Sequence, residues 1–127
     1  MKTENVIIEK TFQFSLSQFS LRIVKLFGYL RNNKVERELA LQLLRSGTSV
    51  GANTEEAMGG SSRKDFIYKL EIAYKEAREA GYWIRLLKES CLLETELANS
   101  ILKDCDEIIK ILTSILKTTK QKSLSTP

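Results

Sequence analysis

The stretch that decides the fold is residues 45–70, RSGTSVGANTEEAMGGSSRKDFIYKL. It begins as a helical segment rich in small residues, and the pair Gly59-Gly60 interrupts it, since glycine favours helix C-terminal conformations. Ser62 and Asp65 then have the spacing of a capping box, in which a serine side chain accepts a backbone hydrogen bond three residues on. The stretch therefore predicts the end of one helix, a short turn and the start of another.

Polar residues lie on the expected core face of the first of these two helices. At about 100° per residue, one face collects apolar residues together with Ser46 and Asn53. A buried polar group without a partner costs roughly 1–3 kcal/mol, so these side chains need hydrogen-bond partners. We expect a buried polar motif made of Arg45, Ser49, Asn53 and Glu56. The alternative is a solvated polar flank beside an ordinary core.

Apolar residues recur at helical spacing in four segments, and the only proline is Pro127. The segments predict helices at about residues 11–31, 34–58, 63–88 and 94–117, with Asn33 and Glu36 at the start of the second. Short connections predict an all-α, antiparallel up-down-up-down four-helix bundle. We expect residues 1–10 to form an N-terminal lead-in and residues 118–127 a flexible C-terminal tail.

The composition excludes several kinds of active site. The chain has 127 residues, enough for one domain, and no histidine, which removes the commonest general base and the usual zinc and di-iron ligands. Cys91 and Cys105 lack metal-ligand spacing. Glutamates such as Glu76 and Glu79 would be the carboxylates of any catalytic pair. We expect no enzymatic activity, no cofactor and no metal, no contact with membranes, and a cytoplasmic location.

The second and third helices each carry a second apolar stripe that one bundle cannot bury. A large exposed apolar surface usually marks an interface, so we expect self-association through these stripes. The alternative is scattered surface aromatics, which are common. The expected interface residues are Leu41, Leu44, Thr48, Gly51, Tyr68, Ile72, Trp83 and Leu86.

The formal net charge of +4 favours an anionic partner such as RNA. In an antiparallel bundle the two basic clusters would lie at opposite ends, and a ring would gather each cluster into an annulus. The alternative is an ordinary solvated surface. The candidate nucleic-acid residues are Arg22, Lys25, Arg31 and Lys34 in one cluster, and Lys110, Lys117, Lys120 and Lys122 in the other.

Several motifs occur together in one order. They are Arg45-Ser46, Ser49-Val50, Asn53, Glu56-Ala57, residues 62–67 (SRKDFI), Leu70, residues 76–79 (EARE) and Tyr82-Trp83. This order resembles the bacterial four-helix-bundle proteins encoded in intervening sequences of the 23S ribosomal RNA gene. The resemblance covers about residues 12–116. Thr54, where the family more often has an aliphatic residue, and the variable Gly59-Gly60 region depart from the pattern.

The resemblance implies an all-helical fold and a ring-like homopentamer. A distant relative, the accessory variability protein of diversity-generating retroelements, forms a basic pentameric barrel and partners a reverse transcriptase and its RNA. That likeness is at the level of the fold and supports function only by analogy. We therefore expect a non-catalytic, oligomeric RNA-binding or ribonucleoprotein accessory protein, with itself and RNA or a nucleic-acid enzyme as partners. The alternative is a purely structural or protein-interaction module.

Overall fold

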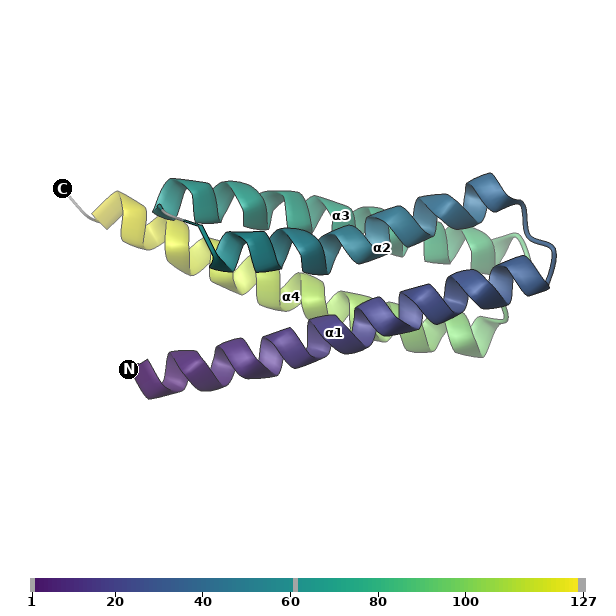
Figure 1. The fold of residues 1–127 in the computed structure, drawn as a ribbon, viewed down its shortest axis with the longest axis horizontal. Coiled ribbons are helices and arrows are strands. Elements are labelled where there is room, and N and C mark those ends of the chain that lie inside the picture. Colours follow the sequence, from purple (N-terminus) through teal and green to yellow (C-terminus); the bar gives the residue numbers. More distant parts are fainter. Residues whose placement is uncertain (1, 61, 126–127) are drawn as a thin grey trace.

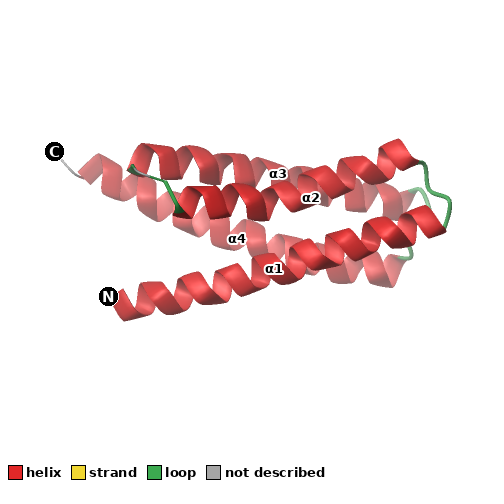
Figure 2. Cartoon of the chain, in the orientation of Figure 1, coloured by secondary structure: helices red, strands yellow, loops and turns green. Residues whose placement is uncertain are grey.

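The computed structural model describes residues 2–60 and 62–125, with side chains for residues 10–60 and 62–122. Over this part, the chain forms four α-helices and no strand (Figures 1 and 2): α1 (Lys2–Asn32), α2 (Arg37–Met58), α3 (Arg63–Glu89) and α4 (Thr95–Ser125). Each helix packs against its neighbours in the order α1, α2, α3, α4 and back to α1. The predicted antiparallel four-helix bundle is confirmed.

The core lies along the bundle axis and comes from the apolar faces that the periodicity predicts. Every helix contributes fully buried side chains, and burying each large one stabilises the fold by roughly 1.5–3 kcal/mol. The largest are Phe19, Ile23, Leu30, Leu43, Leu70, Ile84, Leu87, Ile101, Ile108 and Leu112.

The first and last helices are longer than the sequence analysis predicted. α1 begins at Lys2 instead of about Thr11, and α4 continues to Ser125 instead of ending near Lys117. The described parts of the expected lead-in and tail are therefore helical. No proline or glycine interrupts either extension, so each added residue extends a formed helix by one hydrogen bond. The last two residues of the expected tail lie outside the described part of the chain.

The turns at one end of the bundle share one geometry. Lys34, after α1, and Cys91, after α3, both have a φ of 63°. The backbone N–H of Val35 donates to the Leu30 carbonyl at 2.9 Å, and that of Leu92 donates to the Leu87 carbonyl at 2.9 Å. These are the six-to-one bonds of the Schellman motif, which ends a helix with a left-handed residue.

The helix starts match the sequence prediction in one case and differ in the other. Before α3, Ser62 Oγ accepts a hydrogen bond from the Asp65 backbone N–H at 3.1 Å, as predicted. Before α2, the N-cap is Glu36, which makes no capping hydrogen bond with its side chain. Asn33 instead donates from Nδ2 to the Tyr29 carbonyl at 2.7 Å. The predicted role of Asn33 at the start of α2 is therefore wrong. Its side chain hydrogen-bonds a carbonyl group in the last turn of α1.

The closest approach of α1 to α2 depends on a glycine. A Cβ at Gly47 would lie 2.8 Å from Ile23 Cγ2, and one at Gly51 would lie 3.1 Å from Ser20 Oγ. Gly47 is itself buried. The small residues of the central stretch thus serve packing inside the subunit, where α1 is the neighbouring helix.

Replacing Gly47 with alanine should lower the free energy of unfolding by about 1–3 kcal/mol, because the new methyl group overlaps the buried Ile23 side chain. Gly28→Ala is the matched control, since a Cβ there meets nothing within 4 Å and alanine favours a helix by up to about 1 kcal/mol. Urea denaturation followed by circular dichroism measures both changes. A Gly47→Ala variant at least as stable as the wild type would contradict this account of the helix contact.

Candidate interaction surfaces

The polar residues of α2 are satisfied mainly by their own helix. Asn53 is half-buried and donates from Nδ2 to the Ser49 carbonyl at 2.8 Å, and buried Ser46 donates to the Gln42 carbonyl at 2.8 Å. Arg45 and Glu56, by contrast, are exposed. Asn53 therefore contacts Ser49, and no hydrogen bond joins Arg45 or Glu56 to these two residues in the described part of the chain.

Two further polar residues of α2 have different roles. Glu56 points toward α3, and Thr54 lies in the core, where the sequence analysis did not place it. Glu56 Oε2 lies 3.5 Å from Lys69 Nζ. Thr54 is fully buried, and its Oγ1 donates to the Val50 carbonyl at 2.8 Å. Its position four residues after Val50, on the core face, was the signal that could have identified it.

Two carboxylates of α3, Glu76 and Glu79, lie close enough to influence each other. Burial, and to a smaller extent the nearby charge of Glu79, raise the pKa of Glu76 above its usual value. Glu79 itself accepts a hydrogen bond from the Trp83 indole N–H at 3.4 Å. Among the described residues, no group of three cysteine, aspartate or glutamate side chains could hold a metal ion.

The expected interface residues form two separate stripes, one on α2 and one on α3. Leu41, Leu44, Thr48 and Gly51 are half-buried, and the contact of Gly51 with α1 places this stripe on the α1 side. On α3, Tyr68 is 59% exposed, and its companions Ile72, Trp83 and Leu86 are half-buried. Ile72 and Trp83 lie within about 60° of Lys69, which meets Glu56 of α2, and Tyr68 and Leu86 lie about 100° from it, on the outer side of α3.

The structure adds an exposed apolar stripe on α1 that the sequence analysis missed. Phe14, Leu21 and Val24 are 66%, 54% and 52% exposed. With Ser17 and Gly28 they recur at intervals of three and four residues, behind the core face. The stripe was readable from this spacing, but the stronger core stripe of the same helix obscured it. We define the α1–α2 face as Phe14, Ser17, Leu21, Val24, Gly28, Leu41, Leu44, Thr48 and Gly51.

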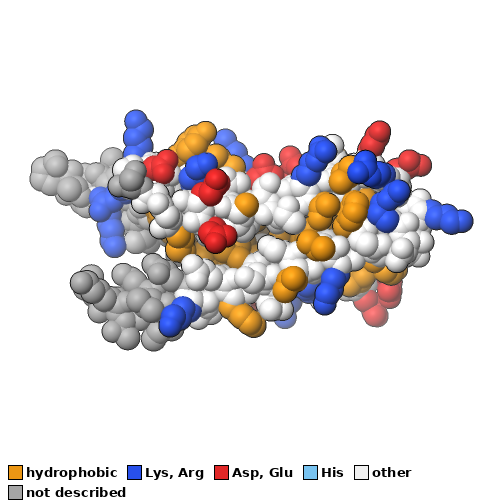
Figure 3. All heavy atoms as spheres, in the orientation of Figure 1, with side chains coloured by type: hydrophobic (Ala, Val, Ile, Leu, Met, Phe, Trp, Pro, Cys, Tyr) orange, Lys and Arg blue, Asp and Glu red, His pale blue; other side chains and the backbone are white. Residues whose placement is uncertain are grey.

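Figure 3 shows the side of the molecule on which α1 and α2 lie nearest the viewer. Hydrophobic side chains group over α2 and the adjoining part of α1, and charged side chains lie along the outline and, as acidic groups, over the C-terminal half of α2. An apolar surface with little charge in its middle is typical of a protein interface.

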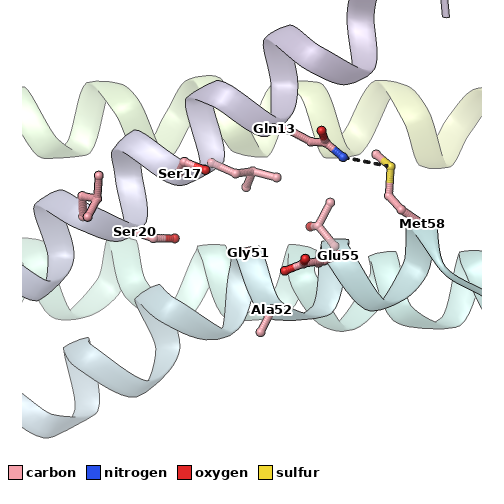
Figure 4. Close-up of a pocket in the computed structure, with 10 residues that line it drawn as sticks. Gln13, Ser17, Ser20, Gly51, Ala52, Glu55 and Met58 are labelled. Carbon is pink, nitrogen blue, oxygen red and sulfur yellow. Dashed lines mark hydrogen bonds between the residues drawn. The ribbon is translucent and has the colours of Figure 1, made fainter. Parts of the chain in front are cut away.

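A groove of about 670 Å³ runs between α1 and α2 (Figure 4). Gln13, Ser17 and Ser20 reach into it from α1, and Glu55 and Met58 from α2, with Gln13 Nε2 3.8 Å from Met58 Sδ. Glu55 is the one titratable group among the lining residues. The groove therefore has no acid–base pair, and its character is that of a packing surface.

The first basic cluster does not form one surface. Arg22 Nη1 lies 2.6 Å from Asp104 Oδ2, and Nη2 donates to Ser100 Oγ at 2.9 Å, so Arg22 ties α1 to α4. Arg31 donates to the Val35 carbonyl at 2.9 Å and supports the turn. Nine residues of helix place Arg31 about 180° from Arg22. Lys25 and Lys34 are exposed.

The second basic cluster lies on the surface of α4. Lys110, Lys117 and Lys122 are exposed on α4. Lys120 Nζ lies 2.7 Å from Glu71 Oε1 of α3 and is partly neutralised. The cluster therefore offers cations along the outer side of α4.

No helix in the described part of the chain is both long and apolar enough to cross a membrane.

The two cysteines lie in opposite environments. Cys105 is fully buried and donates from Sγ to the Ala77 carbonyl at 3.2 Å, while Cys91 is exposed in the turn before α4. Burial, followed by the charge of Asp106, raises the pKa of the Cys105 thiol to about 12. The thiolate, which is the reactive form, is thus strongly disfavoured at Cys105.

A thiol reagent at about pH 8 should label exposed Cys91 of the folded protein rapidly and buried Cys105 only after denaturation. The Cys91→Ser variant should then show no rapid labelling. Mass spectrometry of the labelled protein identifies the site. Rapid modification of Cys105 in the folded state would contradict its burial.

The chain resembles proteins of one family over most of its length. Residues 9–114 match the model of the family described as 23S rRNA-intervening sequence protein. A solved structure from the S23 ribosomal protein family, a protein of unknown function from Bacteroides thetaiotaomicron, is 45% identical, with a TM-score of 0.81 over 84% of this chain and 98% of that one. No curated protein matches the chain. The order of motifs around Asn53, the four-helix bundle and these matches agree, and the protein belongs to the 23S rRNA-intervening sequence protein family.

Proposed function

We propose that this protein is a non-catalytic, self-associating helical bundle that binds RNA in the cytoplasm as a ribonucleoprotein accessory factor. The observation that carries the proposal is the exposure of apolar side chains on two separate faces of the subunit. One is the α1–α2 face, and the other is the α2–α3 face, which we define as Tyr68, Ile72, Trp83 and Leu86.

Two different faces favour a ring over a two-fold dimer. A two-fold dimer pairs one face with itself, whereas a heterologous contact joins two different faces and gives a ring when the rotation from one subunit to the next closes. In such a ring the α1–α2 face of one subunit would meet the α2–α3 face of the next. Fully burying a side chain such as Phe14 or Trp83 is worth roughly 1.5–3 kcal/mol, and a ring repeats the contact at each subunit. The sequence resemblance favours five subunits.

RNA is the anionic partner that the remaining observations favour. The net charge is +4, and exposed cations include Lys25, Lys34, Lys110 and Lys117. The family takes its name from intervening sequences of 23S rRNA, and the similar solved protein is assigned to a ribosomal protein family. A ring would repeat each cluster of cations around its axis and so present several to one phosphate backbone.

A purely structural or protein-interaction module is the second candidate. Arg22 and Lys120, two of the eight candidate nucleic-acid residues, are ion-paired within the subunit. Each pair lowers the charge available to phosphate. RNA binding by the wild-type protein at low salt separates the two candidates.

The wild-type protein should have a native mass several times that of the 14.5 kDa chain. Leu21→Glu and Trp83→Glu should each lower that mass while leaving most of the helix content, because each places a charge on a proposed interface. Ser114→Glu, on the exposed back of α4, is the control and should leave the mass unchanged. Light scattering with circular dichroism measures both properties, and a monomeric wild type at micromolar concentration would refute self-association.

The affinity for single-stranded RNA should fall steeply with salt. Four phosphate contacts predict a loss of about 50-fold between about 50 and 200 mM salt, from a slope of roughly −0.7 per contact. Fluorescence anisotropy with a labelled oligonucleotide measures this slope. Absence of binding at low salt would favour the interaction module.

A further inference from the structure

A row of cations outside the eight candidate nucleic-acid residues follows the outer side of α3. Lys64, Lys75, Arg78 and Arg85 are all exposed, and so is Tyr82 between them. At 100° per residue, these positions fall within a strip about 100° wide. The strip faces away from the core side chains of the same helix.

The outer side of α4 carries a matching row of lysines. Lys103, Lys110 and Lys117 are exposed and spaced seven residues apart, which is two helical turns or about 10.5 Å. A hollow of about 450 Å³ lies between Lys103 and Lys110, with Asn99 and half-buried Leu102 among its lining residues.

Contacts along the seam between α3 and α4 place the two rows next to each other. Lys88 Nζ donates to Asn99 Oδ1 at 2.8 Å near one end, and Lys120 meets Glu71 at the other. Between them, a Cβ at Gly81 would lie 3.2 Å from Arg85 Nη1 and 3.7 Å from Cys105 Sγ. We define the α3–α4 face as Lys75, Arg78, Arg85, Lys103, Lys110 and Lys117.

Most acidic groups near this face are occupied or lie elsewhere. Glu71 pairs with Lys120, and Asp104 pairs with Arg22 on the α1 side of α4. Exposed Asp106 and Glu107 on α4 and exposed Glu79 and Glu89 on α3 remain, and Glu79 accepts the Trp83 hydrogen bond. Six cations therefore face four carboxylates, and none of the six makes an ion pair within the described residues.

Flat groups suited to stacking lie among the cations. Tyr82 is 50% exposed, and the Trp83 ring supports it edge-on with centroids 5.0 Å apart. The Arg78 guanidinium lies 5.8 Å from the centroid of the Tyr74 ring and donates to the Tyr74 hydroxyl at 3.0 Å, so its plane is held in place. Unstacked bases pack on exposed aromatic rings and on arginine planes, whereas a duplex does not offer them.

We propose that the α3–α4 face binds single-stranded RNA, with its cations on the phosphates and a base stacked on Tyr82. This assignment rests on the proposed RNA-binding function and names the surface and the type of strand. It leaves the α1–α2 face free for another subunit, because α1 and α2 pack on the other side of the bundle from the α3–α4 seam. Trp83 of the α2–α3 face adjoins Tyr82, so one edge of the α3–α4 face borders the proposed contact between subunits.

The first test compares two triple variants that remove the same charge. Lys75→Gln/Arg78→Gln/Arg85→Gln alters the α3–α4 face, and Lys10→Gln/Arg37→Gln/Arg45→Gln alters exposed cations of α1 and α2 that are not assigned to RNA. With labelled oligouridylate, the first variant should reduce the steepness of log K against log salt by about 2, since three phosphate contacts are lost. The second should keep the wild-type slope. Equal slopes for both variants would overturn the assignment of the face.

The second test concerns stacking. Tyr82→Ala should weaken binding of the single strand at least about fivefold, and Tyr82→Phe should keep it, since the ring remains. A duplex RNA of equal length should bind more weakly than the strand. Unchanged affinity in Tyr82→Ala, or equal binding of the duplex, would overturn the single-strand assignment.

The outcomes also separate this inference from the proposed function. If the wild type binds no RNA at low salt, the proposed function fails and the inference fails with it. If the wild type binds RNA but the α3–α4 variant does so equally well, only the inference fails. Displacement of the RNA by polyglutamate at equal charge concentration would point to an acidic protein partner and overturn it as well. Circular dichroism of every variant confirms that the bundle is folded.

Discussion

The close packing of α1 against α2 at Gly47 is the constraint on which the outer surfaces depend. Ile23 fills the space that a side chain at Gly47 would need, and both residues are buried. This contact fixes which side of α1 enters the core. Leu21 and Val24, on the other side, must then face solvent in the single subunit. The interface proposed here is thus a consequence of how tightly two helices meet inside the bundle.

Hydroxyl groups can be buried on the core face of α2 because they are satisfied within their own helix. Ser46 and Thr54 donate to carbonyl groups four residues earlier in their own helix, at 2.8 Å in each case. No partner from another helix is needed. The core face of α2 can therefore consist of small, uncharged side chains at these positions. Such bonds avoid the cost of an unsatisfied buried donor but add little specificity to the contact.

The α1–α2 and α3–α4 faces differ in charge, and the α2–α3 face lies between them. The α1–α2 face combines leucine, valine and phenylalanine with small residues, whereas the α3–α4 face carries exposed lysine and arginine. One side can therefore bury apolar area against another subunit, while the other keeps its cations in water until an anion binds. A surface that mixed the two would pay the cost of burying unpaired charge on assembly.

The sequence by itself determined the number of helices, their breaks and nearly all of the core, because helical periodicity and capping are local properties of the chain. It placed Ser62 as a cap, although it ended α4 too early. Only the tertiary structure decided which cations are free. Arg22 is paired with Asp104, 82 residues away, and Lys120 with Glu71, while Arg78 and Arg85 remain exposed. Periodicity gives the direction of a side chain on its own helix, but the rotation and crossing of packed helices decide what that side chain meets.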